Sequence, residues 1–94
     1  MSEHIEICEQ VTIVNQKGLH ARAASKFVKC VSGFEAVMEV SRGEMKVAAT
    51  SIMGLMMLAA SKGTSLRICA YGKDAEAALA AIINLISDRF EEDE

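Results

Sequence analysis

The residues best suited to chemistry are a histidine and an arginine that follow a glycine, in the run Gly18-Leu19-His20-Ala21-Arg22. The next apolar residues recur at helical spacing, so His20 is expected at a helix start, where backbone N–H groups lack intrahelical partners. That position attracts anions and disfavours a further positive charge, so a neutral, nucleophilic imidazole is expected. Arg22 adds a fork of donors that suits phosphate oxygens. Together these residues could accept a phosphoryl group and hand it on.

The element that must position this pair is a helix predicted from Ala21 to about Ser32. Its buried face is indicated by four apolar residues at helical spacing: Ala24, Phe27, Val28 and Val31. Gly33 follows the last turn, as is common at helix ends. Gly18 allows a backbone conformation that a Cβ would penalise, so the turn before His20 can be tight.

A second candidate site is Ser51, at the start of a short apolar segment from Ile52 to Ala59. Thr50 or Ser51 can cap the helix predicted there. Leu55 and Leu58 are expected to face the core. The side chains expected nearer the surface, as a flexible apolar patch for binding partners, are Ile52, Met53 and Met56.

The remaining pattern predicts strands over residues 5–14, 34–40, 45–47 and 66–71, because apolar and polar residues alternate there. Ser41-Arg42-Gly43 is expected to form the turn of a hairpin, and a wide apolar stripe after Asp74 predicts a last helix. The order is β-α-β-β-α-β-α. We therefore expect an α+β open-faced sandwich, a four-stranded antiparallel sheet with three helices on one face. One domain should span residues 1–94, with its acidic tail, 91–94, disordered.

Charge is distributed unevenly along the chain, which carries a net charge of −3. No acidic residue lies between Gln10 and Phe34, a stretch that contains Lys17, Arg22, Lys26 and Lys29, whereas residues 91–94 are all acidic. Lys26 and Lys29 are therefore candidates for docking an acidic partner surface, although a solvated helix face would look the same. An acidic chain with few aromatic residues argues against nucleic-acid binding.

Cysteine and histidine positions give no metal or cofactor site. Cys8, Cys30 and Cys69 are far apart and form no C-x-x-C pair, so we expect free, partly buried thiols in a reducing compartment. No nucleotide-binding loop or carboxylate pair is present, and a stand-alone enzyme is disfavoured. No apolar run reaches the length of a membrane span, and the acidic N-terminus does not resemble a signal peptide. We expect a cytoplasmic monomer without membrane insertion.

Two motifs resemble those of the HPr family, the histidine-containing phosphocarriers of the bacterial phosphoenolpyruvate-dependent phosphotransferase system. The run from Gly18 to Arg22 resembles the family's active-site signature, and Ser51-Ile52-Met53-Gly54-Leu55-Met56 resembles its regulatory-serine segment. The resemblance implies that His20 accepts phosphate on Nδ1 from enzyme I and passes it to an enzyme IIA, with Arg22 stabilising the phosphate. It also implies Ser51 as a target of HPr kinase/phosphorylase, in bacteria that have that enzyme.

Some positions depart from the family pattern. Ala23 replaces a common proline, and Thr50 replaces a lysine found beside the serine in many sugar-system members. The stretch from Ser61-Lys62-Gly63 to the acidic end is more similar to the nitrogen-related, regulatory branch. The sugar-transport carrier is the alternative, and a protein-binding module of the same fold that is not phosphorylated is a further one.

Overall fold

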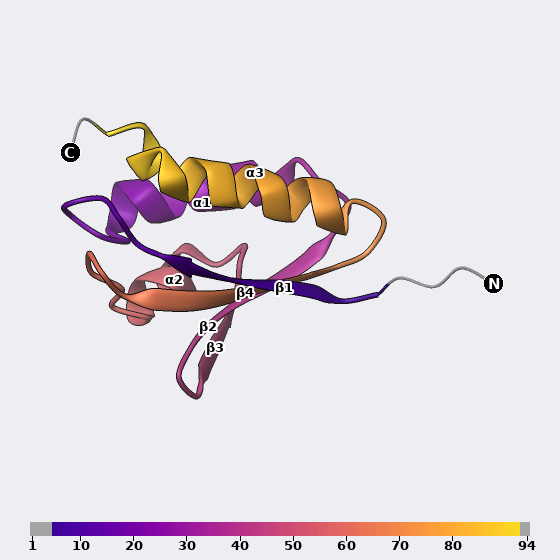
Figure 1. Ribbon diagram of the computed structural model, residues 1–94, viewed down its shortest axis with the longest axis horizontal. Coiled ribbons are helices and arrows are strands. Elements are labelled where there is room, and N and C mark those ends of the chain that lie inside the picture. The colour runs from indigo at the N-terminus through magenta and orange to yellow at the C-terminus, as the bar shows by residue number, and fades with distance from the viewer. Residues whose placement is uncertain (1–4, 93–94) are drawn as a thin grey trace.

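The computed structural model describes residues 5–92, and it contains the predicted elements in the predicted order. The elements are β1 (Ile7–Thr12), α1 (Ala21–Ser32), β2 (Val37–Arg42), β3 (Met45–Ala48), α2 (Ile52–Met57), β4 (Ser65–Tyr71), α3 (Ala75–Ser87) and a 3-10 turn, η1 (Arg89–Glu91). All strand pairs are antiparallel, in the order β1-β4-β2-β3. Helices α1 and α3 lie together over one face of the sheet (Figure 1). The predicted open-faced sandwich is confirmed.

The hydrophobic core lies between the sheet and the helices. Its largest fully buried apolar side chains are Phe27, Phe90, Ile13, Leu55, Leu66, Ile68, Ile82, Ile86 and Val40. Every second residue of β4 faces this core, as the alternation predicted, because successive side chains of a strand point to opposite faces. Leu55 and Leu58 of the α2 region join the same core, which places α2 on the helical side of the sheet.

Several predicted boundaries were wrong by a few residues, and β2 begins at Val37 instead of residue 34. Strand β2 continues to Arg42, which pairs with Met45, so the hairpin turn consists of Gly43 and Glu44 and not of residues 41–43. Helix α2 ends at Met57, and Ala59, predicted as its last residue, has a φ of 52°, which a right-handed helix cannot contain. The first strand is shorter than residues 5–14 because its pairing with β4 runs only from residue 7 to residue 12.

The prediction of three free thiols was wrong. Cys8 and Cys69 are neighbours across the β1–β4 ladder and form a disulfide, while Cys30 remains free. Both paired cysteines lie on the polar side of their strands, so the bond lies on the sheet face opposite the helices. The two residues are 61 positions apart, so only the strand register reveals that they meet.

The predicted disorder of the acidic tail was wrong for residues 91 and 92, while residues 93–94 lie outside the described part. Arg89, Phe90 and Glu91 all have positive φ, and this left-handed turn redirects the chain after α3. Phe90 is fully buried and anchors the turn in the core. Glu91 and Glu92 are therefore held close to the start of α1, as Figure 1 shows for the end of the described chain.

Candidate functional site

His20 occupies the position immediately before helix α1. Its backbone is extended, with φ −81° and ψ −178°, and its carbonyl accepts the first helical hydrogen bond, from Ala24. The preceding residue, Leu19, is buried and donates its N–H to the carbonyl of Ala60 over 2.8 Å. The imidazole itself is 28% exposed. The histidine is thus fixed through its backbone while its ring reaches the surface.

The ring of His20 contacts a carboxylate that the sequence analysis did not single out. Nε2 lies 2.6 Å from Oε2 of Glu92, and the other carboxylate oxygen, Oε1, accepts a hydrogen bond of 3.1 Å from Nδ2 of Asn15. Asn15 is completely buried and also donates from Nδ2 to the carbonyl of Gly18 over 2.8 Å. Asn15, His20 and Glu92 therefore form one connected group, which we call the His20 cluster.

One signal in the sequence could have revealed Asn15. The strand alternation that places Val11 and Ile13 inward continues to residue 15, so a polar side chain is directed into the core. A buried amide needs partners, which marks it as a residue with a specific role. Glu92 had no such signal, because it follows His20 by 72 positions.

The charge of Glu92 is stabilised by its neighbours. Partial burial pushes the pKa of this carboxyl up, but hydrogen bonds from His20 and Asn15 and the positive charges of His20 and Lys17 outweigh the burial. The net pKa is lower than its ordinary value. The carboxylate is therefore ionised at neutral pH, and an ionised carboxylate can only accept hydrogen bonds.

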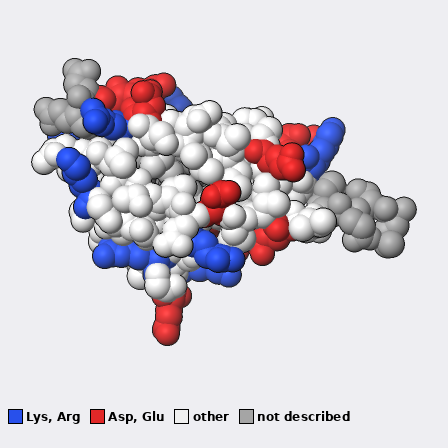
Figure 2. All heavy atoms as spheres, in the orientation of Figure 1, with Lys and Arg blue, Asp and Glu red and all other residues white. Residues whose placement is uncertain are grey.

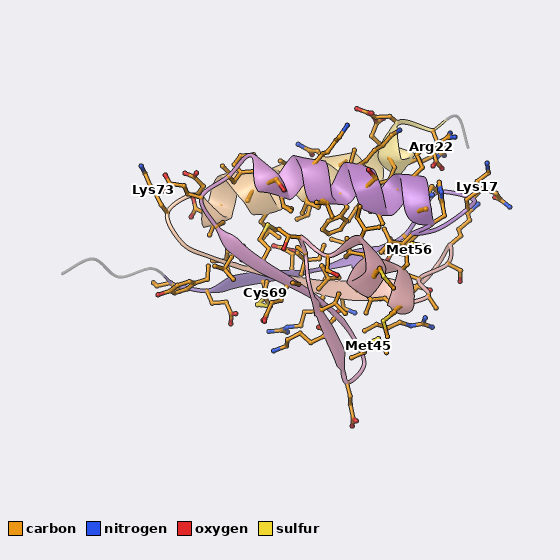
Figure 3. The ribbon with its side chains drawn as sticks, turned by 180° about the vertical axis from the view of Figure 1, so that it is seen from behind. Lys17, Arg22, Met45, Met56, Cys69 and Lys73 are labelled. Carbon is orange, nitrogen blue, oxygen red and sulfur yellow. A yellow bond between two sulfur atoms is a disulfide. The ribbon has the colours of Figure 1, made fainter. Side chains whose placement is uncertain are left out.

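Arg22 lies on the exposed side of the first turn of α1. Its guanidinium forms no hydrogen bond or ion pair with any residue between 5 and 92. Figure 3 places Arg22 and Lys17 at the same end of the molecule, where α1 begins. The surface view shows basic side chains at this end next to a group of acidic ones, with further basic side chains elsewhere on the same face (Figure 2). The predicted cation is thus available to an incoming anion.

The two lysines assigned to partner docking differ. Lys26 donates from Nζ to the carbonyl of Phe90 over 2.7 Å and lies 3.7 Å from Glu91 Oε1, so it holds the C-terminal turn against α1. Its assignment to a docking surface is weakened, because this charge is already engaged within the protein. Lys29 is exposed and remains a candidate.

Ser51 precedes α2, and its Oγ accepts a hydrogen bond of 2.9 Å from the N–H of Gly54. The predicted cap is confirmed for Ser51 and not for Thr50. The neighbouring patch is exposed as predicted, with Ile52 at 41%, Met53 at 74% and Met56 at 44% exposure, and Met57, which was not predicted, adds to it at 63%. We call these four residues the α2 patch.

The hollow beside His20 is small. It has a volume of about 190 Å³ and is lined by Lys17, Leu19, His20, Ala59, Ala60 and Ser61. Ligand pockets for cofactors usually enclose at least about 300 Å³. The hollow is large enough for a group of the size of a phosphate placed against the imidazole.

Elsewhere, potential metal ligands converge at one point of the described chain, where the ligand atoms of Glu6, Cys8 and Cys69 lie within 4.8 Å of one another. Both sulfurs are consumed by the disulfide, which leaves one exposed carboxylate. This group therefore does not offer a metal site while the disulfide is intact. Among the described helices, none has the length and apolar character needed to cross a membrane.

Comparison with known proteins connects this geometry to one family. The family model described as "PTS HPr component phosphorylation site" matches residues 7–88. The chain is 45% identical over 83 residues to phosphocarrier protein NPr of Shewanella violacea, covering 88% of this chain and 91% of that protein. It is also 45% identical over 86 residues to phosphocarrier protein HPr of Pseudomonas aeruginosa, covering 90% and 96%. The crystal structure of HPr-C-His from Thermoanaerobacter tengcongensis superimposes with a TM-score of 0.89 at 39% identity, covering 94% of this chain and 99% of that one.

Proposed function

This chain belongs to the HPr family of phosphocarriers of the phosphotransferase system, and we propose that His20 is the residue that carries its phosphoryl group. In this proposal His20 takes the group from the phosphohistidine of enzyme I and passes it to an enzyme IIA. The observation that carries the proposal is the position of the imidazole, part-exposed at the start of α1 and two residues before Arg22, whose guanidinium is unengaged among residues 5–92. The protein acts as a substrate of phosphotransferases and not as a stand-alone enzyme.

The surroundings of His20 supply what phosphoryl transfer needs, which is positioning and neutralisation of charge. The backbone N–H groups of residues 21–23 have no carbonyl partner within α1, because they belong to its first turn. These donors and Arg22 can contact the phosphoryl oxygens. The exposed α2 patch borders the same end of the molecule through Ala59 and Ala60 and would contact the partner proteins, together with Lys29.

The proposal is tested by incubating the protein with phosphoenolpyruvate and an active enzyme I. We expect the mass of one phosphate to be added through an acid-labile bond, and His20→Ala to abolish the addition. His4→Ala, which removes the other histidine, is the matched control and should be phosphorylated normally. Wild-type protein that stays unmodified, while the same enzyme I phosphorylates a known carrier, would support the binding module of the same fold.

We propose the nitrogen-related, regulatory branch for this carrier. The segment Ser61-Lys62-Gly63, the alanine-rich α3 and the similarity to an NPr support this branch, while an HPr relative at the same identity keeps the sugar-transport carrier as the alternative. Phosphorylated protein offered to both types of enzyme IIA separates the two. Faster transfer to the regulatory enzyme IIA is expected, and faster transfer to a sugar-specific one would assign the chain to the sugar branch.

We further propose Ser51 as a site of regulatory phosphorylation. A phosphate there would bring about −1.5 to −2 charges next to the α2 patch and hinder docking of an acidic partner. Incubation with ATP and an HPr kinase/phosphorylase should give acid-stable phosphate that Ser51→Ala abolishes and Thr50→Ala leaves unchanged. Equal labelling of the Ser51 variant would contradict the assignment.

A further inference from the structure

The contact between Glu92 and His20 has a role that the proposed function alone does not require. We propose that Glu92 is a positioning residue, whose carboxylate keeps the proton of His20 on Nε2 so that Nδ1 presents the lone pair that attacks phosphorus. This inference rests on the proposed function. It adds Glu92 to the phosphoryl-transfer site and gives a physical reason for reaction at Nδ1, the ring nitrogen that the family resemblance already implies.

The hydrogen-bond geometry determines which ring nitrogen is protonated. Nε2 lies 2.6 Å from Glu92 Oε2, a distance that requires a proton between the two atoms. Because the carboxylate of Glu92 is ionised at neutral pH, the proton belongs to the ring nitrogen. A neutral imidazole has a single N–H, so Nδ1 is left with its lone pair.

The position of Glu92 is itself fixed by contacts from other parts of the chain. Asn15 Nδ2 faces two acceptors, Glu92 Oε1 and the carbonyl of Gly18, so its side-chain amide has one sensible orientation. Phe90, two residues before Glu92, is fully buried, and Lys26 donates to its carbonyl. The Glu92 carboxylate is thus fixed by its own contacts with Asn15 and His20, and its backbone is fixed by the buried Phe90 two residues earlier.

Asn15 uses the amide nitrogen of its side chain, and not the amide oxygen, within the His20 cluster. Its Oδ1 is buried without a hydrogen-bond partner in the described part of the chain. An unsatisfied buried acceptor opposes folding. The amide nitrogen of Asn15 meanwhile fixes Glu92 through its hydrogen bond to Oε1.

The chemical step balances with this arrangement. The Nδ1 lone pair forms the new N–P bond while the N–P bond of the donor's phosphohistidine breaks, and the donor nitrogen keeps that electron pair. The His20 ring retains its Nε2–H and becomes cationic, with the Glu92 carboxylate opposite the new charge. In the onward transfer the same contact is kept while the N–P bond breaks and the electron pair returns to Nδ1.

The test compares Glu92→Ala and Glu92→Gln with the control Glu91→Gln, whose carboxylate only lies 3.7 Å from Lys26. Nitrogen-15 NMR of the His20 ring, at a pH where the ring is neutral, should show the Nε2–H form in the wild type. Glu92→Ala should shift the ring towards a mixture of both tautomers and slow phosphorylation by enzyme I about tenfold. Glu92→Gln has an amide oxygen that can still accept from Nε2–H. It should therefore keep the Nε2–H tautomer of the wild type, with a phosphorylation rate between those of Glu92→Ala and the wild type. Glu91→Gln should match the wild type in both measurements.

The outcomes separate this inference from the proposed function. If folded Glu92→Ala has the wild-type tautomer or the wild-type phosphorylation rate, Glu92 does not position His20, although His20 can still be the carrier. If the wild type takes up no phosphate from an active enzyme I, the proposed function is wrong, and the role of Glu92 in transfer is wrong with it.

Discussion

Gly18 packs directly against the backbone of Ala60. Its φ is +67°, and a Cβ at this position would lie 2.4 Å from the carbonyl oxygen of Ala60 and 2.9 Å from the Cα of Ser61. The same carbonyl accepts the hydrogen bond from Leu19, the residue next to His20. The turn that carries the histidine is therefore docked on the segment that follows α2, and only glycine allows this approach.

Replacing Gly18 should show how much this contact contributes. Gly18→Ala combines the strain of a positive φ, about 1–2 kcal/mol, with a clash against backbone that cannot move aside easily. Gly43→Ala is the matched control, because its φ is +60° and no atom lies within 4 Å of the added Cβ. In urea denaturation, Gly18→Ala should lose clearly more free energy of unfolding than Gly43→Ala. Equal losses would show that the contact with Ala60 is unimportant.

Breaking the disulfide should lower stability without removing the fold. Cys8 and Cys69 close a loop of 61 positions, for which the loss of unfolded-state entropy predicts a contribution of about 4 kcal/mol. Cys8→Ser should therefore lower the free energy of unfolding by that amount, and a reducing agent should lower the wild type to a similar level. Cys30→Ser, which leaves the bond intact, should respond to the reducing agent like the wild type. A wild type insensitive to reduction would contradict this.

Arg22 should matter for phosphoryl transfer and not for folding, because its guanidinium is exposed and unengaged among the described residues. Arg22→Ala should slow phosphorylation by enzyme I about tenfold, less than for a buried donor because solvent screens the charge. Arg22→Lys should be intermediate, since it keeps the charge but loses the fork of donors. Arg67→Ala, on the exposed side of β4, is the control and should transfer normally. An unaffected Arg22→Ala would remove this residue from the site.

The contacts of Glu92 should make stability depend on acid pH. The pKa of Glu92 is lower in the folded protein than its ordinary value of 4.5, because the hydrogen bonds from His20 and Asn15 and the positive charges of His20 and Lys17 outweigh the effect of burial. The stabilisation is therefore present above pH 4.5 and is lost as the pH falls through the lower, folded-state pKa. The free energy of unfolding should fall more steeply below that pH for the wild type than for Glu92→Gln. If the two proteins lose stability equally as the pH falls, the Glu92 carboxylate does not form these contacts in solution.

Much of the fold was predictable because its signals are local. Periods of 3.6 and 2 residues separate helices from strands within short windows, so the element order and the inward residues of β4 were predicted correctly. The cap formed by Ser51 depends on residues three apart, and the exposure of Met53 follows from the helical face opposite Leu55. The position of His20 at the start of α1 was predictable for the same reason, because it depends on the residues that follow it directly.

The tertiary structure alone decided which distant residues meet. The strand register brings Cys8 to Cys69, and the left-handed turn after α3, anchored by buried Phe90, brings Glu92 to His20. No periodic pattern in the sequence predicts either pairing, because each depends on how separate elements pack and not on neighbours along the chain. The sequence by itself thus determined that the His20 imidazole lies at the start of α1, and the packing of the chain decided which carboxylate contacts it.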